Sequence, residues 1–224
     1  MPFLEATVPA IEPRPLKTAY TIGLETEPEA MAEKTRLAAH YPVLKIKLNA
    51  DRPVERMLLI REASPRAELV VDVNEGWSFD QLKDVAPEFA KLGVKMIEQP
   101  LPRGSDAALE GYTPPLPLCA DESCLHTGEL EEAKRRYQMI NVKLDKTGGL
   151  TEALALANAA RAAELGLMFG NMMGTSLAMA PSFVVGQLCD FVDLDGPLLL
   201  AHDRGPCMKY RDGIVSPPVP ELWG

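Results

Sequence analysis

The segment VLKIKLN at residues 43–49 places two lysines, Lys45 and Lys47, among apolar residues near the end of an expected strand. Side chains alternate between the two faces of a strand, so lysines two residues apart point the same way. A strand that is buried on both faces is expected to be apolar throughout. Lys45 and Lys47 therefore indicate a polar site at the carboxyl end of a buried strand.

Short runs of apolar and β-branched residues recur on both sides of this segment, and each is followed by a stretch with helical periodicity. The expected strands span residues 18–25, 43–48, 69–74, 95–99, 116–121, 139–144, 167–170 and 192–194. The expected helices span residues 28–39, 53–63, 78–92, 128–137, 151–165 and 176–188. Residues 101–115 are expected to form either a short helix or a loop.

This alternation of strands and helices predicts an α/β fold with parallel strands and right-handed crossovers. Eight strands favour closure into a (β/α)8-type TIM barrel. An open doubly wound sheet is the alternative, but no glycine-rich phosphate loop follows the first expected strand, which weakens a nucleotide-binding function. We expect the barrel to span residues 18–200, with a proline-rich linker or arm at 1–17 and an irregular tail at 201–224.

The composition argues against several classes of protein. The 224 residues carry a net charge of −9, and no cluster of Lys and Arg marks a nucleic-acid surface. No apolar run is long enough for a membrane span, and the first residues lack the pattern of a secretory signal. The four cysteines form no CxxC pair and are expected to be reduced thiols. We therefore expect a cytoplasmic protein that binds neither nucleic acid nor membrane.

Charged residues stand at the carboxyl ends of successive expected strands. Lys47, Asp72, Glu98, Asp121 and Lys143 follow one another at intervals of 22 to 26 residues, which is one strand–helix unit each. A salt bridge or a solvated strand end is the favoured explanation for any single one of them, but not for a row with this period. The row is expected at the carboxyl-end mouth of the barrel, where active sites of this fold lie.

Three carboxylates in this row, Asp72, Glu98 and Asp121, come from adjacent expected strands. Buried like charges repel and are costly to desolvate, so these three need a cation between them. Ligands that are all oxygen favour hard ions. The sequence therefore predicts a site for Mg²⁺, with Mn²⁺ as the alternative.

Lysines flank this expected metal site from two sides. The ordinary lysine pKa of about 10.4 makes a poor base near neutral pH, but burial beside another cation lowers the pKa of a lysine. Lys47 and Lys143, facing each other across a metal-bound carboxylate, suit removal of an α-proton by one and return of a proton to the opposite face by the other. This arrangement predicts racemisation or epimerisation through an enediolate, with Lys45 as an electrostatic helper.

These motifs together resemble the enolase superfamily, and within it the muconate-lactonizing subgroup. The resemblance rests on KxK, then on Asp, Glu and Asp at the next three strand ends, then on the lysine of KLDKTGG at 143–149. The segment DLDGPLLL at 193–200 resembles the paired-aspartate motif of dipeptide epimerases such as the L-Ala-D/L-Glu epimerases. GNMMGTSLAMAPS and the ending SPPVPELWG are also similar, and the resemblance covers residues 12–224.

The resemblance implies a modified (β/α)7β barrel and a role for each matching residue. Lys47 and Lys143 would be the acid/base pair, and Lys45 would support the enolate. Mg²⁺ would be held by Asp72, Glu98 and Asp121. The remaining two aspartates, Asp193 and Asp195, would bind the α-ammonium group of an L-Ala-Xaa dipeptide from cell-wall peptide turnover.

One departure concerns the start of the chain. Members of this family usually carry an α+β capping domain before the barrel, whereas EPRPLKTAY at 12–20 looks like the linker that follows such a domain. We therefore expect a barrel without its cap, with the site open to water. A separate capping chain and a homo-oligomer are open alternatives for its partners.

Two other functions stay open. The chain could be a related isomerase or lyase, such as an N-acylamino acid racemase, a muconate cycloisomerase or an o-succinylbenzoate synthase. Asp193 and Asp195 argue against these, because their substrates have no free ammonium group at that place. The chain could instead be a catalytically silent barrel that binds a partner.

Overall fold

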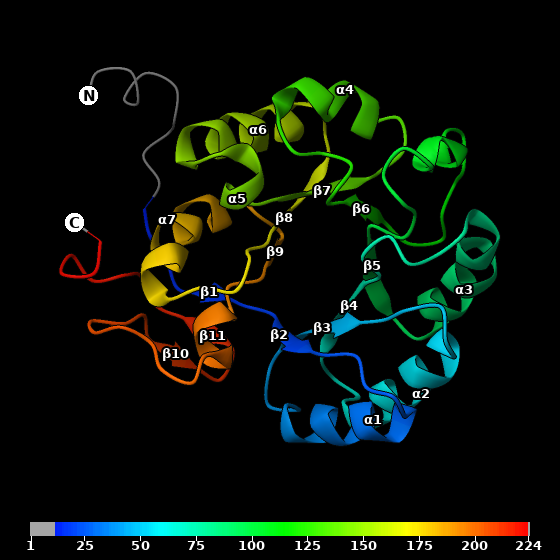
Figure 1. Cartoon of the computed structure of the whole chain (residues 1–224), viewed down its shortest axis with the longest axis horizontal. Coiled ribbons are helices and arrows are strands. Elements are labelled where there is room, and N and C mark those ends of the chain that lie inside the picture. The colour runs from blue at the N-terminus through cyan, green and yellow to red at the C-terminus, as the bar shows by residue number, and fades with distance from the viewer. Residues whose placement is uncertain (1–11, 224) are drawn as a thin grey trace.

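Eight parallel strands form the centre of the computed structural model, which describes residues 12–223. Each strand pairs with the next one along the chain, and the sheet curls until its edges meet at a hydrogen bond of 2.7 Å from Ala19 N to Val192 O. The predicted α/β barrel is therefore confirmed (Figure 1). The strands are β2 (Tyr20–Ile22), β3 (Val43–Lys47), β4 (Glu68–Asp72), β5 (Val94–Glu98), β6 (Leu118–Ala120), β7 (Met139–Val142), β8 (Gly166–Phe169) and β9 (Phe191–Val192).

Helices cover the outside of this barrel (Figure 1). They are α1 (Pro28–Leu37), α2 (Pro53–Ala63), α3 (Phe79–Lys91), α4 (Leu130–Ala133), α5 (Leu144–Thr147), α6 (Leu150–Ala162) and α7 (Ser176–Gly186). Three short 3₁₀ helices accompany them, η1 (Asp106–Leu109), η2 (Thr127–Glu129) and η3 (Gly196–Leu199). In the described part of the chain β9 leads into η3 rather than into a further long helix, which is the (β/α)7β arrangement.

The expected helices match the observed ones except at residues 128–137. Ser78 caps α3 by accepting a hydrogen bond from Gln81 N, as capping serines do. The helix expected over 128–137 is reduced to η2 and the four residues of α4. The chain leaves the helix there because Tyr137 turns inward, where its buried hydroxyl donates to Asp106 at 2.9 Å.

The interior of the barrel is divided into an apolar layer and a polar layer. Alternation along each strand sends every second side chain inward. The inward positions nearer the amino ends form one small apolar cluster of Val70, Met96, Cys119, Met139 and Met168. The inward positions two residues further along four of these strands are Asp72, Glu98, Asp121 and Asn141. The polar residues therefore lie on a packed apolar layer that supports them from below.

A second, three-stranded sheet lies beside the barrel, with order β1 (Leu16–Lys17), β11 (Ile214–Val215), β10 (Tyr210–Arg211). The stretch expected to be an irregular tail thus contains a hairpin, which pairs with the expected linker. The two residues between β10 and β11, Asp212 and Gly213, have φ of 50° and 75°, which fits the primed turns of tight hairpins. In Figure 1 this sheet fills the periphery between α7 and α1. Residues 1–11 of the expected arm lie outside the described residues.

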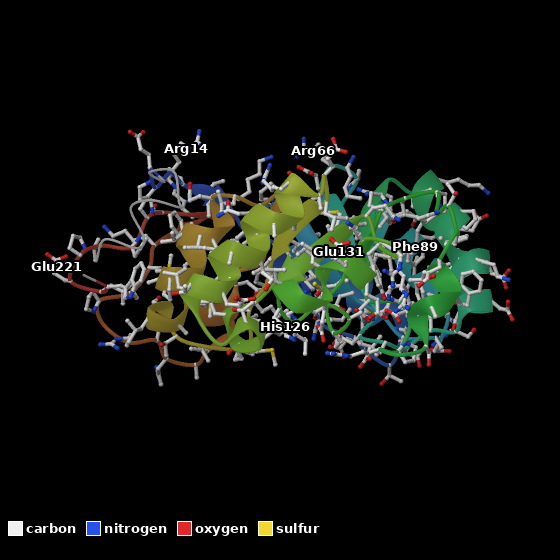
Figure 2. The ribbon with its side chains drawn as sticks, turned by 90° about the horizontal axis from the view of Figure 1, so that it is seen from above. Arg14, Arg66, Phe89, His126, Glu131 and Glu221 are labelled. Carbon is white, nitrogen blue, oxygen red and sulfur yellow. The ribbon has the colours of Figure 1, made fainter. Side chains whose placement is uncertain are left out.

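The parallel strands give the molecule two distinct faces. Figure 2 shows Arg66, which precedes β4, on one face and His126, which follows β6, towards the other. The strand ends that carry the charged residues all lie on the second face. Within residues 12–223, no helix is long and apolar enough to cross a bilayer.

Candidate active site

Lys45 is the central cation of the site. Its side chain is 3% exposed, and its Nζ lies 3.0 Å from Asp72 Oδ2, 2.8 Å from Glu98 Oε2 and 3.2 Å from Asp193 Oδ2. Burial alone would lower the pKa of Lys45, but the three carboxylates outweigh it and hold that pKa well above its ordinary value. Lys45 therefore remains charged and ties β4, β5 and the end of β9 to β3.

Lys47 lies nearer the solvent, with a side chain that is 33% exposed. Its Nζ donates to Asp72 Oδ2 at 2.6 Å and to Asn74 Oδ1 at 2.7 Å. Burial would raise the pKa of Asp72, but Lys45 and Lys47 together hold it below its ordinary value. Asp72 is thus an ionised carboxylate at the bottom of the site, and Lys47 is the cation that a molecule entering from the solvent would meet.

Glu98 is a carboxylate that its neighbours compensate only in part. It is fully buried, and its Oε1 accepts a hydrogen bond from Asn141 Nδ2 at 2.6 Å. Its Oε2 lies near Lys45 but makes no well-directed hydrogen bond. Burial and the negative charge of Asp72 raise the pKa of Glu98 to about 7. The structure therefore leaves part of the charge of Glu98 available to another cation.

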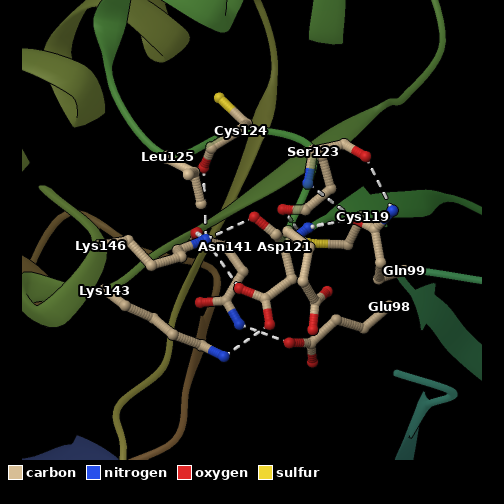
Figure 3. Close-up of polar contacts among 12 residues, drawn as sticks. Glu98, Gln99, Cys119, Asp121, Ser123, Cys124, Leu125, Asn141, Lys143 and Lys146 are labelled. Carbon is tan, nitrogen blue, oxygen red and sulfur yellow. Dashed lines mark hydrogen bonds and ion pairs between the residues drawn. The ribbon is translucent and has the colours of Figure 1, made fainter. Parts of the chain in front are cut away.

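Two lysines contact Asp121, one at each carboxylate oxygen (Figure 3). Lys143 Nζ lies 2.5 Å from Oδ2, and Lys146 Nζ lies 2.7 Å from Oδ1. Burial would raise the pKa of Asp121, but Lys146 and Lys143 hold it well below its ordinary value. Asp121 is therefore held in its ionised form.

Lys143 keeps its proton in this arrangement. Burial alone would lower its pKa, but Asp121 and Glu98 raise it above the ordinary value. The sequence led us to expect a lowered pKa for this lysine, whereas in the structure its pKa is raised. Because the carboxylates cause the shift, a cation that neutralised them would remove it and make Lys143 a better proton acceptor.

Asp193 and Asp195 follow β9 and are both buried. Asp195 Oδ2 accepts a hydrogen bond from Thr21 N at 2.7 Å, whereas Asp193 Oδ1 has no hydrogen-bond partner. Burial and the neighbouring Asp193 raise the pKa of Asp195 to about 7. Two adjacent buried carboxylates with unused acceptor capacity form a place suited to a cationic group.

The donor set fits a hard divalent cation. Asp72, Glu98 and Asp121 offer only oxygen, which suits Mg²⁺. Within residues 12–223, no three carboxylate, histidine or cysteine side chains stand close enough to share an ion, because lysine ammonium groups lie between the carboxylates. The incomplete pairing of Glu98 Oε2 is nevertheless what a metal ligand would show before its ion binds. These three residues are the ones that would hold the metal.

The structure adds residues that the sequence had left without a role. Asn141 orients Glu98, and Lys146 contacts Asp121. Gln99 Oε1 accepts hydrogen bonds from Asp121 N and Ser123 N at 2.9 and 3.1 Å, and so shapes the turn that presents Asp121. Spacing could have indicated Asn141, which stands two residues before Lys143 and shares its face. No pattern indicated Gln99.

Comparison with known proteins gives the family. The model described as "Enolase C-terminal domain-like" matches residues 28–218. The chain is 44% identical over 206 residues to an N-acetyl-D-glutamate racemase from Pseudoalteromonas sp, covering 92% of this chain and 65% of that protein. It is 47% identical over 203 residues to the L-Ala-D/L-Glu epimerase of Escherichia coli (strain K12), covering 90% and 63%. The chain belongs to the enolase C-terminal domain-like family, as the sequence motifs indicated.

Solved structures agree with this assignment. A crystal structure of an enolase family member from Agrobacterium tumefaciens, with homology to dipeptide epimerases and with bound sodium and L-Ala-L-Glu, superposes with a TM-score of 0.92 at 47% identity. It covers 95% of this chain and 65% of that one. A dipeptide epimerase from Methylococcus capsulatus, complexed with Mg and L-Arg-D-Lys, gives a TM-score of 0.83 at 31% identity, covering 91% and 61%. The chain spans less than two thirds of the length of the first relatives it matches.

Proposed function

We propose that this protein epimerises dipeptides of the L-Ala-D/L-Glu type by transferring a proton at the α-carbon next to the terminal carboxylate. The observation that carries the proposal is the position of two lysines at opposite ends of one carboxylate row. Lys47 contacts Asp72 on β4 and Lys143 contacts Asp121 after β6, with Glu98 of β5 between them. A substrate held over this row would have a lysine towards each face of its α-carbon.

The chain's own residues account for the proton transfer. One lysine removes the α-proton, the electron pair passes into the carboxylate as an enediolate, and the other lysine delivers a proton to the opposite face. Lys45, which stays charged under the carboxylate row, would offset part of the developing negative charge. The reaction is reversible with the lysines exchanging roles, so one site would serve both epimers.

The proposal includes Mg²⁺, with Mn²⁺ as an alternative ion, held by Asp72, Glu98 and Asp121. When bound, the ion would supply positive charge that stabilises the enediolate. Relatives of known structure contain Mg or sodium. The partly compensated charge of Glu98 supports a divalent ion here.

We infer that Asp193 and Asp195 bind the ammonium group of the dipeptide. Their positions just after β9 support this role, because Asp193 also contacts Lys45 and therefore adjoins the reaction centre. An ammonium group would take up the acceptor that Asp193 Oδ1 leaves free and offset the repulsion between the two carboxylates.

Racemisation of an N-acylated glutamate is the second candidate function. One relative is named N-acetyl-D-glutamate racemase, and L-Ala-Glu is itself glutamate with an acyl group on its nitrogen. The two substrates differ in the free ammonium group, for which Asp193 and Asp195 provide the matching charge. We therefore place the dipeptide first.

The proposal also covers the metabolic role of the protein, its location in the cell and its partners. L-Ala-D-Glu is a product expected from breakdown of cell-wall peptides, and all four cysteines are free thiols, which supports a reducing, cytoplasmic setting. A second copy of the chain and a separate capping chain are the protein partners that this proposal includes. A barrel that binds metal but turns nothing over would favour the silent-barrel alternative.

Chiral chromatography would test the function. The protein is incubated with Mg²⁺ and either L-Ala-D-Glu or N-acetyl-D-glutamate, and each product is resolved into its epimers. We expect L-Ala-L-Glu to form faster than N-acetyl-L-glutamate, and Asp193→Asn to lower the dipeptide rate selectively. Equal loss of both activities in that variant would remove the ammonium role, and turnover of N-acetyl-D-glutamate alone would establish the second candidate.

A further inference from the structure

Lys146 binds more oxygen atoms than an ammonium group has protons. Its Nζ lies 2.7 Å from Asp121 Oδ1, 2.7 Å from Asp121 O, 2.6 Å from Asn141 O and 3.3 Å from Cys124 O. The side chain is only 13% exposed. A buried ammonium group with four oxygen partners is strongly held, because every one of its three protons has an acceptor and its charge is offset by the Asp121 carboxylate.

The partners of Lys146 come from the ends of two neighbouring strands. Asp121 and Cys124 belong to the turn after β6, and Asn141 is the third residue of β7. Lys146 itself lies on α5, directly after Lys143 and its strand. The ammonium group thus joins the segment that carries Asp121 to the segment that carries Lys143, at the place where both leave the barrel.

The two oxygens of Asp121 are divided between two lysines. Oδ1 accepts from Lys146 and Oδ2 accepts from Lys143. A lysine that gives its proton to substrate becomes neutral, so its contact with its carboxylate is no longer an ion pair for part of the cycle. Lys146 is tied to three backbone oxygens as well and can stay in place, so Asp121 keeps one permanent cationic partner.

We propose that Lys146 is a positioning residue that fixes the carboxylate of Asp121 and thereby directs Lys143 towards one face of the substrate. The inference rests on the proposed epimerisation, in which Lys143 serves one epimer and Lys47 the other. Lys47 depends on a different carboxylate, Asp72, at the far end of the row. Loss of Lys146 should therefore impair one half of the reaction more than the other.

The space around Lys143 supports this directing role. A Cβ atom built on Gly170 would lie 3.0 Å from Lys143 Cε and 2.8 Å from both Asn141 side-chain termini. Lys143 therefore passes through a narrow gap beside Gly170, with Asp121 at its tip. The side chain of Lys143 is confined beside Gly170, and its ammonium group is bound by Asp121. The orientation of the Asp121 carboxylate therefore decides where the ammonium group of Lys143 lies.

The test compares α-proton exchange of the two epimers in D₂O at saturating Mg²⁺, in the full chain and in Lys146→Met. Methionine keeps an unbranched side chain that is one atom shorter than lysine, and it removes the charge and the donors. Lys47→Ala identifies the epimer that Lys143 serves, since only that epimer should still exchange. We expect Lys146→Met to slow exchange of that epimer by about tenfold or more relative to the other. An equal loss for both epimers, or no loss, would overturn the proposal.

Arg56 provides a matched control. It is a buried cation on α2 that donates to the carbonyls of Glu25, Thr26 and Asp51 at 2.8 to 3.0 Å, and it has no carboxylate partner in the site. Arg56→Met should lower the melting temperature as Lys146→Met does, yet leave the ratio of the two exchange rates unchanged. A change in that ratio would mean that lost stability alone produces the asymmetry.

A crystal structure of Lys146→Met judges the proposal independently of turnover. The Asp121 carboxylate is expected to rotate and its contact with Lys143 to lengthen. An unchanged Asp121–Lys143 pair would contradict the positioning role even if the chain proved inactive. Absence of exchange in the unaltered chain with both epimers would instead count against the proposed function and leave the crystal structure to decide on Lys146.

Discussion

Lys47 Nζ lies 2.6 Å from Asp72 Oδ2, and this contact places a partly exposed cation directly over a fully buried carboxylate. A second lysine–aspartate contact lies at the other end of the carboxylate row, where Lys143 contacts Asp121. The chemistry proposed for this barrel depends on these two pairs acting on opposite faces of one carbon atom.

Removal of either lysine should stop epimerisation without unfolding the barrel. In Lys47→Ala and in Lys143→Ala we expect turnover between epimers to fall by at least about a hundredfold, because general acid–base catalysis of this kind contributes about 10² to 10⁴. Circular dichroism should show the folded barrel in both variants. Epimerisation at the normal rate in either variant would rule out the two-lysine mechanism.

Mg²⁺ should stabilise the fold. An ion that binds only the native state at a free concentration of 100 times its Kd adds about 2.7 kcal/mol to the free energy of unfolding. The melting temperature should therefore rise with Mg²⁺ and fall again with EDTA. Glu98→Gln, which removes one predicted ligand, should abolish the rise. A melting temperature that does not respond to Mg²⁺ would exclude a metal site in this chain.

The raised pKa of Asp195 has a consequence for stability. Its pKa is about 7 in the folded protein and about 3.9 in an unfolded chain. Between these values the folded state binds the extra proton, so stability decreases as pH rises from about 4 to 7. Asp195→Asn should flatten this part of the curve of unfolding free energy against pH. An unchanged slope would show that another group is responsible.

Gly170 tests the packing around Lys143. Gly170→Ala would force a methyl group to within 2.8 to 3.0 Å of Asn141 and Lys143, and overpacking of this kind costs about 1–3 kcal/mol. Gly23→Ala is the control, because nothing lies within 4 Å of a Cβ at that position. We expect lower stability and slower epimerisation for the first variant only, as measured by denaturant unfolding and by turnover. Equal behaviour of the two variants would mean that the gap beside Gly170 can widen.

Much of the barrel could be predicted because its strands are short apolar runs and its helices have clear periodicity. Val43–Lys47 and Pro53–Ala63 are found as expected, to within a residue. The hairpin at residues 210–215 was missed although Asp212-Gly213 is a turn signal, because the prolines around it favoured an irregular tail. The break after α4 depends on the inward turn of Tyr137, a tertiary contact that no local pattern shows.

The repeat of strands and helices was enough to predict which residues of the site lie together, but not how they pair. Spacing of about one strand–helix unit placed Asp72, Glu98 and Asp121 on one rim, and the structure brings them there together with the predicted lysines. Which atom pairs with which could not be foreseen, since it depends on burial and on competition among charges. Lys146 is the clearest example, because the three residues that supply its oxygen partners lie 5 to 25 residues away and meet only in the folded barrel.

Epimerisation by this barrel is tested most directly by NMR of the glutamate α-proton in L-Ala-D-Glu, in D₂O with Mg²⁺ and this chain. We expect the α-proton signal to disappear while L-Ala-L-Glu carrying deuterium at that carbon appears. A folded protein that binds Mg²⁺ and leaves the α-proton of both epimers untouched would contradict the proposed epimerisation.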